Sequence, residues 1–322
     1  DTADKFCKIG GRYLFIDEIH KYENWSREIK EIYDLHRELH IVISGSSLLQ
    51  INDGHSDLSR RLTEYQMSGL SFREFMCMMT GVNIEPIELS SLLNSPNLFC
   101  QEVKRHFHPL EYFHLYLKEG YYPFYFENKK MYHNVIENVI NYIVDNELTM
   151  FRGLEVGNSR RIKALLQVLS KMVPYEVDIS KLSRTIGIQR PTTLKYLKNL
   201  EEAALIRRLF TKIDTITDLQ KPDKILIDNS NILYTLSDSN PEIGTVRETF
   251  FCNQLCAAGH IVEYGGLKTG DFRIDKEIVI EVGGSDKGLK QIQNEEYGYV
   301  AADDIDNAIF RKIPLWAFGF LY

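Results

Sequence analysis

Residues 13–18 read Tyr-Leu-Phe-Ile-Asp-Glu, a short apolar run that ends in two acidic residues. Four consecutive apolar residues predict a buried strand. A second apolar run, residues 40–43, follows a stretch from Trp25 to Leu39 in which apolar residues recur at helical spacing. Strand, helix and strand within about 30 residues make up the unit of a parallel α/β sheet. We therefore expect two central strands of a parallel sheet that is covered on both faces.

The two acidic residues stand at the end of the first strand, and open α/β sheets bind their ligands at the carboxyl ends of their strands. Asp17 can hold Mg²⁺, and Glu18 can polarise a water that attacks a phosphate. Ser44 and Ser46 follow the second strand, so a hydroxyl there can hydrogen-bond a γ-phosphate or the attacking water. An acidic turn and a Ser/Gly turn that merely end two strands are the alternative interpretation.

Two arginines follow in the run from Asp57 to Arg61. A guanidinium that faces developing phosphate charge accelerates phosphoryl transfer, so Arg60 and Arg61 are candidates for that role. Arginines on a solvated helix surface are the alternative.

Four stretches, taken in order, resemble the prokaryotic AAA+-type ATPases in which a C-terminal domain of unknown function follows the ATPase core. They are residues 13–21 with Trp25 soon after, residues 42–47 (Val-Ile-Ser-Gly-Ser-Ser), residues 58–61 (Leu-Ser-Arg-Arg) and residues 70–75 (Leu-Ser-Phe-Arg-Glu-Phe). The ordered combination is far more specific than any single stretch.

The resemblance implies ATP and Mg²⁺ as ligands. It makes Asp17 and Glu18 the Walker B acids, one of the two serines the sensor, and Arg60 or Arg61 the arginine finger. Residues 120–123 (Gly-Tyr-Tyr-Pro) resemble a turn in the helical part of the family. Because an arginine finger usually serves a neighbouring subunit, the resemblance also suggests a homo-oligomer.

One element of the family is missing from this sequence. The glycine-rich loop Gly-x-x-x-x-Gly-Lys-Ser/Thr, whose amides and lysine hold the phosphates, occurs nowhere in the chain. We expect it upstream of Asp1, so that this chain carries half of a nucleotide site.

The stretch 179–210 predicts helix, turn, helix and strand, which is the order of a winged helix. Residues 181–212 contain eight Lys/Arg but only two acids, so DNA contact through Arg190, Lys195 and Lys198 is one interpretation. A winged helix that packs between two domains without touching DNA is the other. The residues expected to face outward are Arg190, Thr192, Thr193, Lys195, Tyr196 and Asn199.

The C-terminal part resembles the PD-(D/E)XK nucleases in three acidic residues. Glu248 lies in a predicted helix, while Asp271 and Glu281 belong to predicted strands, and three carboxylates can hold Mg²⁺ for phosphodiester cleavage. The lysine expected two residues after Glu281 is Gly283, and Lys287 stands in a Gly/Ser-rich turn. We therefore expect a nuclease-like fold without strong nuclease activity.

Composition excludes few functions but sets limits on them. The 322 residues are too many for one ordinary core, and the net charge of −7 argues against nucleic-acid binding over the whole surface. No apolar run approaches the ~18 residues of a membrane span. Five scattered cysteines favour reduced thiols in a cytoplasmic protein.

The sequence thus predicts an α/β protein in four parts. They are the end of a P-loop AAA+-type parallel sheet core (1–80), a helical lid (81–170), a winged helix (171–215) and a nuclease-like α/β domain (216–322). The leading function is ATP binding and hydrolysis by the intact protein, coupled to DNA or a protein partner, with no membrane. A binding module with a vestigial ATPase site and a metal-dependent nuclease remain the alternatives.

Overall fold

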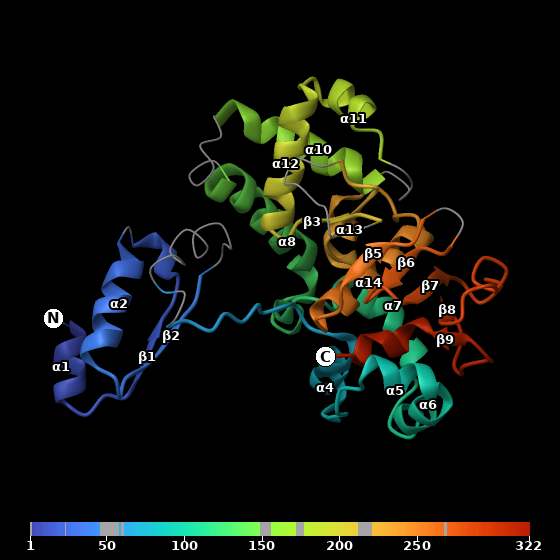
Figure 1. Ribbon diagram of the computed structural model, residues 1–322, viewed down its shortest axis with the longest axis horizontal. Coiled ribbons are helices and arrows are strands. Elements are labelled where there is room, and N and C mark those ends of the chain that lie inside the picture. Colours follow the sequence, from blue (N-terminus) through green and yellow to red (C-terminus); the bar gives the residue numbers. More distant parts are fainter. Residues whose placement is uncertain are drawn as a thin grey trace. The chain divides into compact units, whose positions relative to one another are not determined.

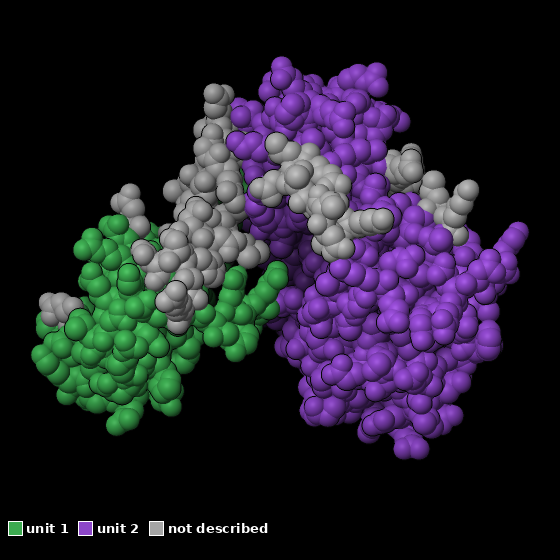
Figure 2. Space-filling view, viewed as in Figure 1, with its two compact units in different colours: residues 1–67, 146–154 green, residues 68–145, 155–322 purple. Residues whose placement is uncertain are grey.

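Strands β1 (Tyr13–Ile16) and β2 (His40–Ile43) pair in parallel, with Tyr13 opposite His40 and Ile16 opposite Ile43. The computed structural model that shows this describes residues 2–22, 24–45, 58, 61–148, 156–171, 177–211, 221–266 and 269–322. The chain is a mixed α/β structure that divides into two units (Figure 2). Unit 1 is residues 1–67 with 146–154, and unit 2 is residues 68–145 with 155–322. The four-part organisation expected from the sequence stays a prediction.

Unit 1 has a helix on one face of its two strands. Trp25 and Ile29 of α2 are buried together with Ile19 and Leu58, and residues of both strands pack against them. The elements of this unit are α1 (Thr2–Lys8), β1, the 3₁₀ turn η1 (Ile19–Lys21), α2 (Trp25–Leu35) and β2 (Figure 1).

The expectation that both strands are covered on two faces is wrong for this unit. Tyr13 is 64% exposed and Phe15 72%, and Val42 of the neighbouring strand is also exposed. Successive side chains of a strand point to opposite faces, so Ile16, Ile41 and Ile43 are partly buried against the helix, while Tyr13, Phe15 and Val42 face solvent.

Unit 2 begins with a mainly helical part. The bounds of its elements are α4 (Phe72–Thr80), α5 (Leu89–Asn94), α6 (Pro96–Lys104), α7 (Pro109–Glu119), η2 (Pro123–Phe126), η3 (Lys129–Met131) and α8 (Tyr132–Tyr142), followed by the π turn η4 (Ile143–Glu147), the 3₁₀ turn η5 (Val156–Asn158), α10 (Ser159–Lys171), α11 (Ile179–Ile186) and α12 (Arg190–Glu202).

The first helix of unit 2 contains the stretch Leu-Ser-Phe-Arg-Glu-Phe. Ser71 begins α4 as its cap, accepting from the Glu74 amide at 3.1 Å while the Glu74 carboxylate accepts from the Ser71 amide. Phe72 is fully buried against the rings of Phe113 and Phe320. Arg73 donates to the backbone carbonyl of Tyr322 at 2.8 Å. This stretch therefore packs in the core of unit 2.

The rest of unit 2 is α/β. An antiparallel pair, β3 (Ile206–Leu209) and β4 (Lys224–Ile227), follows α12, and a five-stranded sheet has the order β5-β6-β7-β8-β9. Strand β6 runs antiparallel to both of its neighbours, β5 and β7, whereas β8 runs parallel to β7 and to β9. The remaining bounds are α13 (Ser230–Leu236), α14 (Ile243–Ala257), β5 (Val262–Tyr264), β6 (Phe272–Ile274), β7 (Ile278–Gly283), β8 (Gly298–Ala302), β9 (Lys312–Pro314) and the buried 3₁₀ turn η6 (Leu315–Phe320).

Strand β7 is the centre of this sheet, as its nearly continuous apolar sequence predicted. Helix α14 packs against β7, and Phe251 of this helix contacts Phe272 of β6 with ring centroids 5.3 Å apart. Among the helices of the described residues, none combines the length and apolar character that a membrane crossing needs.

Candidate functional site

The carboxyl ends of β1 and β2 bring Asp17 and Ser44 together. The Ser44 hydroxyl donates to Oδ1 of Asp17, and the Glu18 amide donates to the same oxygen at 3.1 Å. The amide of Ile19 donates to the Ser44 carbonyl at 3.0 Å, which ties the turn after β1 to the end of β2. Two donors on one oxygen fix the orientation of the Asp17 carboxylate, as a metal-binding or water-positioning role requires.

Glu18 has a left-handed backbone, with φ of 53°. This conformation is uncommon for a residue with a side chain and turns the chain sharply after the strand. Its carboxylate is half-buried and lies 3.0 Å from Nζ of Lys21, one turn further along. Glu18 and Asp17 thus stand side by side at the sheet edge with different partners.

Arg61 lies in a two-bonded ion pair with Asp34 of α2. Its Nε donates to Oδ1 at 3.0 Å and its Nη2 donates to Oδ2 at 3.1 Å. The pair lowers the pKa of Asp34, mainly through the hydrogen bond from Arg61. An arginine finger at this position would have to leave Asp34. Ser46 and Arg60 lie outside the described residues.

Helix α12 is buried on more sides than its pattern predicted. Thr193, Tyr196 and Asn199, expected to face outward, are buried, and the Thr193 hydroxyl pairs with Ser183 of α11 at 2.7 Å. Thr193 satisfies its hydroxyl within the fold by bonding to Ser183 and to the Gln189 carbonyl, so polarity alone does not mark the solvent face of α12.

Three of the basic residues in this region are neutralised within the fold. Arg207 pairs with Asp228 at 3.0 Å, Arg208 pairs with Glu201, and Lys198 lies 3.7 Å from Glu202. The basic side chains that stay exposed are Lys181, Arg184, Arg190 and Lys195. Of the three DNA-contact candidates, Arg190 and Lys195 therefore face solvent, and Lys198 is half-buried.

The second group of predicted site residues gathers around β7. Glu281 lies on this strand, Glu248 lies on α14, and Asp271 stands immediately before β6 rather than within a strand as predicted. The Asp271 carboxylate accepts from the Val282 amide at 2.8 Å. The three acids and two lysines, Lys224 and Lys287, form what we call the acid cluster.

Glu281 is the most deeply buried member of the acid cluster, with 1% of its surface exposed. Its Oε1 is paired with Nζ of Lys287, whereas its Oε2 has no hydrogen-bond partner. That Oε2 faces Gly270, where a Cβ would stand 3.6 Å away. Burial and the neighbouring Asp271 raise the pKa of Glu281.

Glu248 has a lysine partner from another part of unit 2. Lys224, on β4, is 2% exposed and places its Nζ 2.8 Å from Oε2 of Glu248. The same ammonium lies over the Phe272 ring, 4.9 Å from its centroid. Burial raises the pKa of Glu248 to about 7, with Lys224 opposing the shift and Asp271 adding to it.

The place left by Gly283 is filled by another side chain. A Cβ at Gly283 would stand 2.7 Å from Cγ and Cδ of Lys287, so the stem of this lysine lies over the glycine. The sequence-based inference that position 283 leaves a gap beside Glu281 is therefore wrong, because the turn after β7 returns a lysine to it.

The carboxylates of the acid cluster couple electrostatically but do not converge closely. Among the described residues, the group of potential metal ligands whose atoms all lie within 4.8 Å of one another is His114, Asp303 and Asp304. Arg247 pairs with both carboxylates of that group and offsets one of their two charges, donating to Asp303 at 2.8 Å and to Asp304 at 3.2 Å.

Comparison with known proteins bears on both units. Residues 2–76 match the family model of an AAA domain. The match covers residues 2–67 of unit 1 but not residues 146–154, and we call unit 1 the AAA-like unit after it. The match also includes most of α4, which packs in unit 2.

Residues 110–242 match a second family model, that of a domain of unknown function (DUF8612). The uncharacterized protein MJ1637 of Methanocaldococcus jannaschii is 22% identical over 308 residues. The alignment covers 87% of this chain and 63% of that protein, so the chain spans less than two thirds of its relative. No solved structure matches this chain.

Three partners of these site residues carried no signal in the sequence. Lys21, beside Glu18, belongs to the family-like stretch 13–21 but had no assigned role, and Asp34, beside Arg61, lies in the predicted helical stretch 25–39. Lys224 begins an apolar strand, where a lysine ordinarily marks the exposed end. The whole of β4 is buried against β3 and the helices α10, α13 and α14, and this burial places the ammonium inside.

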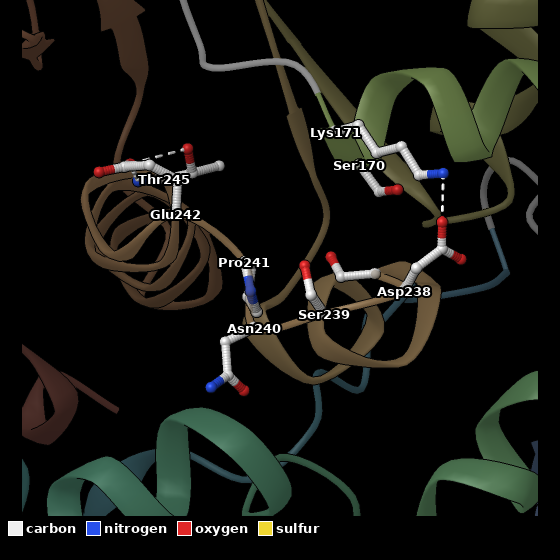
Figure 3. A pocket seen from close by; sticks show the side chains of 9 residues that line it. Ser170, Lys171, Asp238, Ser239, Asn240, Pro241, Glu242 and Thr245 are labelled. Atoms are coloured by element: carbon white, nitrogen blue, oxygen red, sulfur yellow. Dashed lines mark hydrogen bonds and ion pairs between the residues drawn. The ribbon is translucent and has the colours of Figure 1, made fainter.

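A polar pocket of about 320 Å³ lies apart from both sites (Figure 3). Glu242 accepts from the Thr245 amide at 2.8 Å and so begins α14, while Lys171 pairs with Asp238. The charged side chains that line this pocket are thus bonded to one another or to other residues of the lining.

Proposed function

We propose that the AAA-like unit forms the hydrolysis half of an ATP site and that the protein hydrolyses ATP with Mg²⁺ when this half meets a phosphate-binding loop. The observation that carries the proposal is the hydrogen bond between Ser44 and Asp17 across the ends of two parallel strands, in a region that matches an AAA domain. Turnover of ATP by a Glu18→Gln variant tests it.

The residues present suit magnesium and phosphate chemistry. Mg²⁺ prefers oxygen ligands and keeps several waters, and both described hydrogen bonds to Asp17 use Oδ1, so neither occupies Oδ2. Glu18, next to Asp17, is placed to orient and deprotonate a water. When bound, Mg²⁺ would offset charge on the phosphate oxygens. A binding module with a vestigial site is the competing proposal.

DNA is the partner that we propose for the exposed basic residues of unit 2. Three helices, α10 to α12, followed by the antiparallel pair β3–β4, have the order of elements found in a winged helix. The proposal rests on the exposed side chains of Arg190 and Lys195, since the fold neutralises much of the local basic excess.

Replacing Arg190 and Lys195 together by Ala is expected to weaken DNA binding and to lower the salt slope by roughly 2, because each phosphate contact releases about one counterion. Affinity measured by fluorescence anisotropy from low to moderate salt gives the slope. Lys198→Ala is the matched control, with a smaller effect because Glu202 already pairs with that lysine. An unchanged slope in the double variant would leave α12 with a purely structural role.

Metal-dependent phosphodiester cleavage is the second candidate function. The observation that favours it is the buried Oε2 of Glu281, which lacks a hydrogen-bond partner, while the nearby Asp271 carboxylate adds a second negative charge. A buried carboxylate oxygen without a donor is costly, and a divalent cation would satisfy it. Glu281, Asp271 and Glu248 would hold that cation, provided that their oxygens move closer together than in this structure.

Purified protein is expected to cut single-stranded DNA with Mn²⁺ or Mg²⁺, and Asp271→Ala and Glu281→Ala are each expected to remove that activity. The sequence alone predicted weak cleavage, on the ground that Gly283 leaves a gap, and Lys287 fills that gap. Gel assays on plasmid, single-stranded DNA and RNA measure the outcome. Glu277→Ala, which changes an exposed acid just before β7, should cut like the unaltered protein. Cutting that survives Glu281→Ala would assign the activity to a contaminant.

A further inference from the structure

The turn after β7 brings a lysine back to the acid cluster. The Lys287 amide donates to the Gly284 carbonyl at 3.0 Å, which closes a turn of four residues. The Lys287 stem then runs over Gly283, and its Nζ reaches Oε1 of Glu281. Any side chain at position 283 would collide with this stem, so the glycine and the returning lysine fit each other.

The Lys287 ammonium is paired with a buried carboxylate, since its Nζ contacts Oε1 of Glu281. Three carboxylates face two ammonium groups in the acid cluster, one from Lys287 and one from Lys224. The cluster therefore keeps an excess of one negative charge when all five groups are ionised.

An open cavity adjoins the outer side of Lys287. It has a volume of about 600 Å³ and is lined by Lys287, Gly288, Lys290, Gln291 and Asn294. This lining carries two lysines, a glutamine and an asparagine, and it carries no acid. Lys287 lies between this basic cavity and the buried Glu281, with its side chain only half-buried.

We infer that Lys287 is a phosphate-binding residue, which holds a phosphodiester entering from this cavity against the acid cluster. The inference rests on the proposed cleavage function. In that function, Lys287 would provide the basic group that is absent at position 283. An ammonium that is held by one carboxylate and open to the cavity on its other side can exchange part of its pairing for a phosphate oxygen. The competing explanation is that Lys287 only neutralises Glu281.

The two explanations predict different effects on two ligands. If Lys287 binds phosphate, removing its charge weakens phosphodiester binding while metal binding stays equal or tightens, because a cation that competes for Glu281 has gone. If Lys287 only neutralises Glu281, removing its charge leaves phosphodiester binding unchanged. Lys287→Met is the best variant, since methionine keeps much of the stem over Gly283.

The experiment uses the full chain carrying Arg190→Ala and Lys195→Ala, so that α12 adds nothing to the signal. Affinity for a fluorescein-labelled hexathymidylate, measured with Ca²⁺ present, is expected to fall roughly 10- to 100-fold in Lys287→Met, the range for a lost charge-assisted hydrogen bond. Lys287→Arg should restore part of it. Lys130→Ala, which removes an exposed lysine of η3 that does not line this cavity, should change it little.

Mn²⁺ binding, measured by calorimetry without DNA, completes the test. Lys287→Met is expected to bind Mn²⁺ at least as tightly as the parent, whereas Glu281→Gln is expected to lose Mn²⁺ binding. Unchanged hexathymidylate affinity in Lys287→Met, a parent that does not bind hexathymidylate, or equal losses of both ligands would overturn the role of Lys287. A parent that binds hexathymidylate through Lys287 but never binds Mn²⁺ would instead overturn metal-dependent cleavage and leave the phosphate site standing.

Discussion

Glu18→Gln is expected to reduce ATP turnover by roughly 10²–10⁴-fold while ATP affinity stays unchanged. The variant is made in a protein that also contains the phosphate-binding loop. Glutamine has the size of glutamate but cannot take a proton from water, so the attacking water loses its base. Binding persists because the Asp17–Ser44 hydrogen bond involves no atom of the Glu18 side chain. Steady-state phosphate release gives turnover, and binding of a fluorescent ATP analogue gives affinity.

Glu31→Gln is the matched control for this result, since it makes the same chemical change at an exposed acid of α2 that pairs with Arg27. It should leave turnover as it was. The 322-residue chain alone should hydrolyse little ATP, because it contains no Gly-x-x-x-x-Gly-Lys-Ser/Thr loop. Undiminished turnover in Glu18→Gln would show that another residue activates the water.

Lys224→Met is expected to lower the free energy of unfolding by about 3–5 kcal/mol, because it leaves the Glu248 carboxylate buried without its partner. Methionine preserves the volume and the contact with the Phe272 ring, so most of the loss is electrostatic. Urea unfolding followed by fluorescence measures it.

The second variant needed is Lys224→Met with Glu248→Gln. Removing both charges should recover most of the loss, since an uncharged pair carries no unpaired buried charge. A double variant as unstable as Lys224→Met would show that packing, and not charge, holds this site.

The buried Glu248, which pairs with Lys224, also makes the free energy of unfolding depend on pH in a direction that can be stated. The folded-state pKa of Glu248, about 7, lies above its ordinary value of 4.5, so the folded state binds the proton more tightly. The stabilisation from this proton is complete below pH 4.5 and is lost as the pH rises to about 7. Glu248→Gln should flatten this part of the profile.

The central strands of this protein could be predicted because their apolar runs are nearly unbroken. The parallel pair of β1 with β2 and the central place of β7 both follow from that signal. The exposure of Tyr13 and Phe15 could not be predicted, since an apolar run does not say how many helices cover it.

The basic partners of the candidate sites were harder to predict than their carboxylates. Acids at the ends of strands are visible in the sequence, but their partners come from distant positions. Lys224 reaches Glu248 across 24 residues, and Lys287 reaches Glu281 through a turn whose direction depends on Gly283. On α12, side-chain polarity did not predict exposure either, since Thr193 is polar and fully buried.

The position of α4 shows that the segment matched by the AAA family model and the structural unit end at different residues. Residues 2–76 share one family pattern, yet Phe72 fills space between Phe113 and Phe320, and Arg73 binds the carbonyl of Tyr322. A fragment that ends at residue 76 would include Phe72, a core residue of unit 2. The remainder of the chain would then lack this ring and contain an apolar cavity between Phe113 and Phe320. The boundary between residues 67 and 68, one of three at which the chain passes between the two units, keeps α4 with the rings that it packs against.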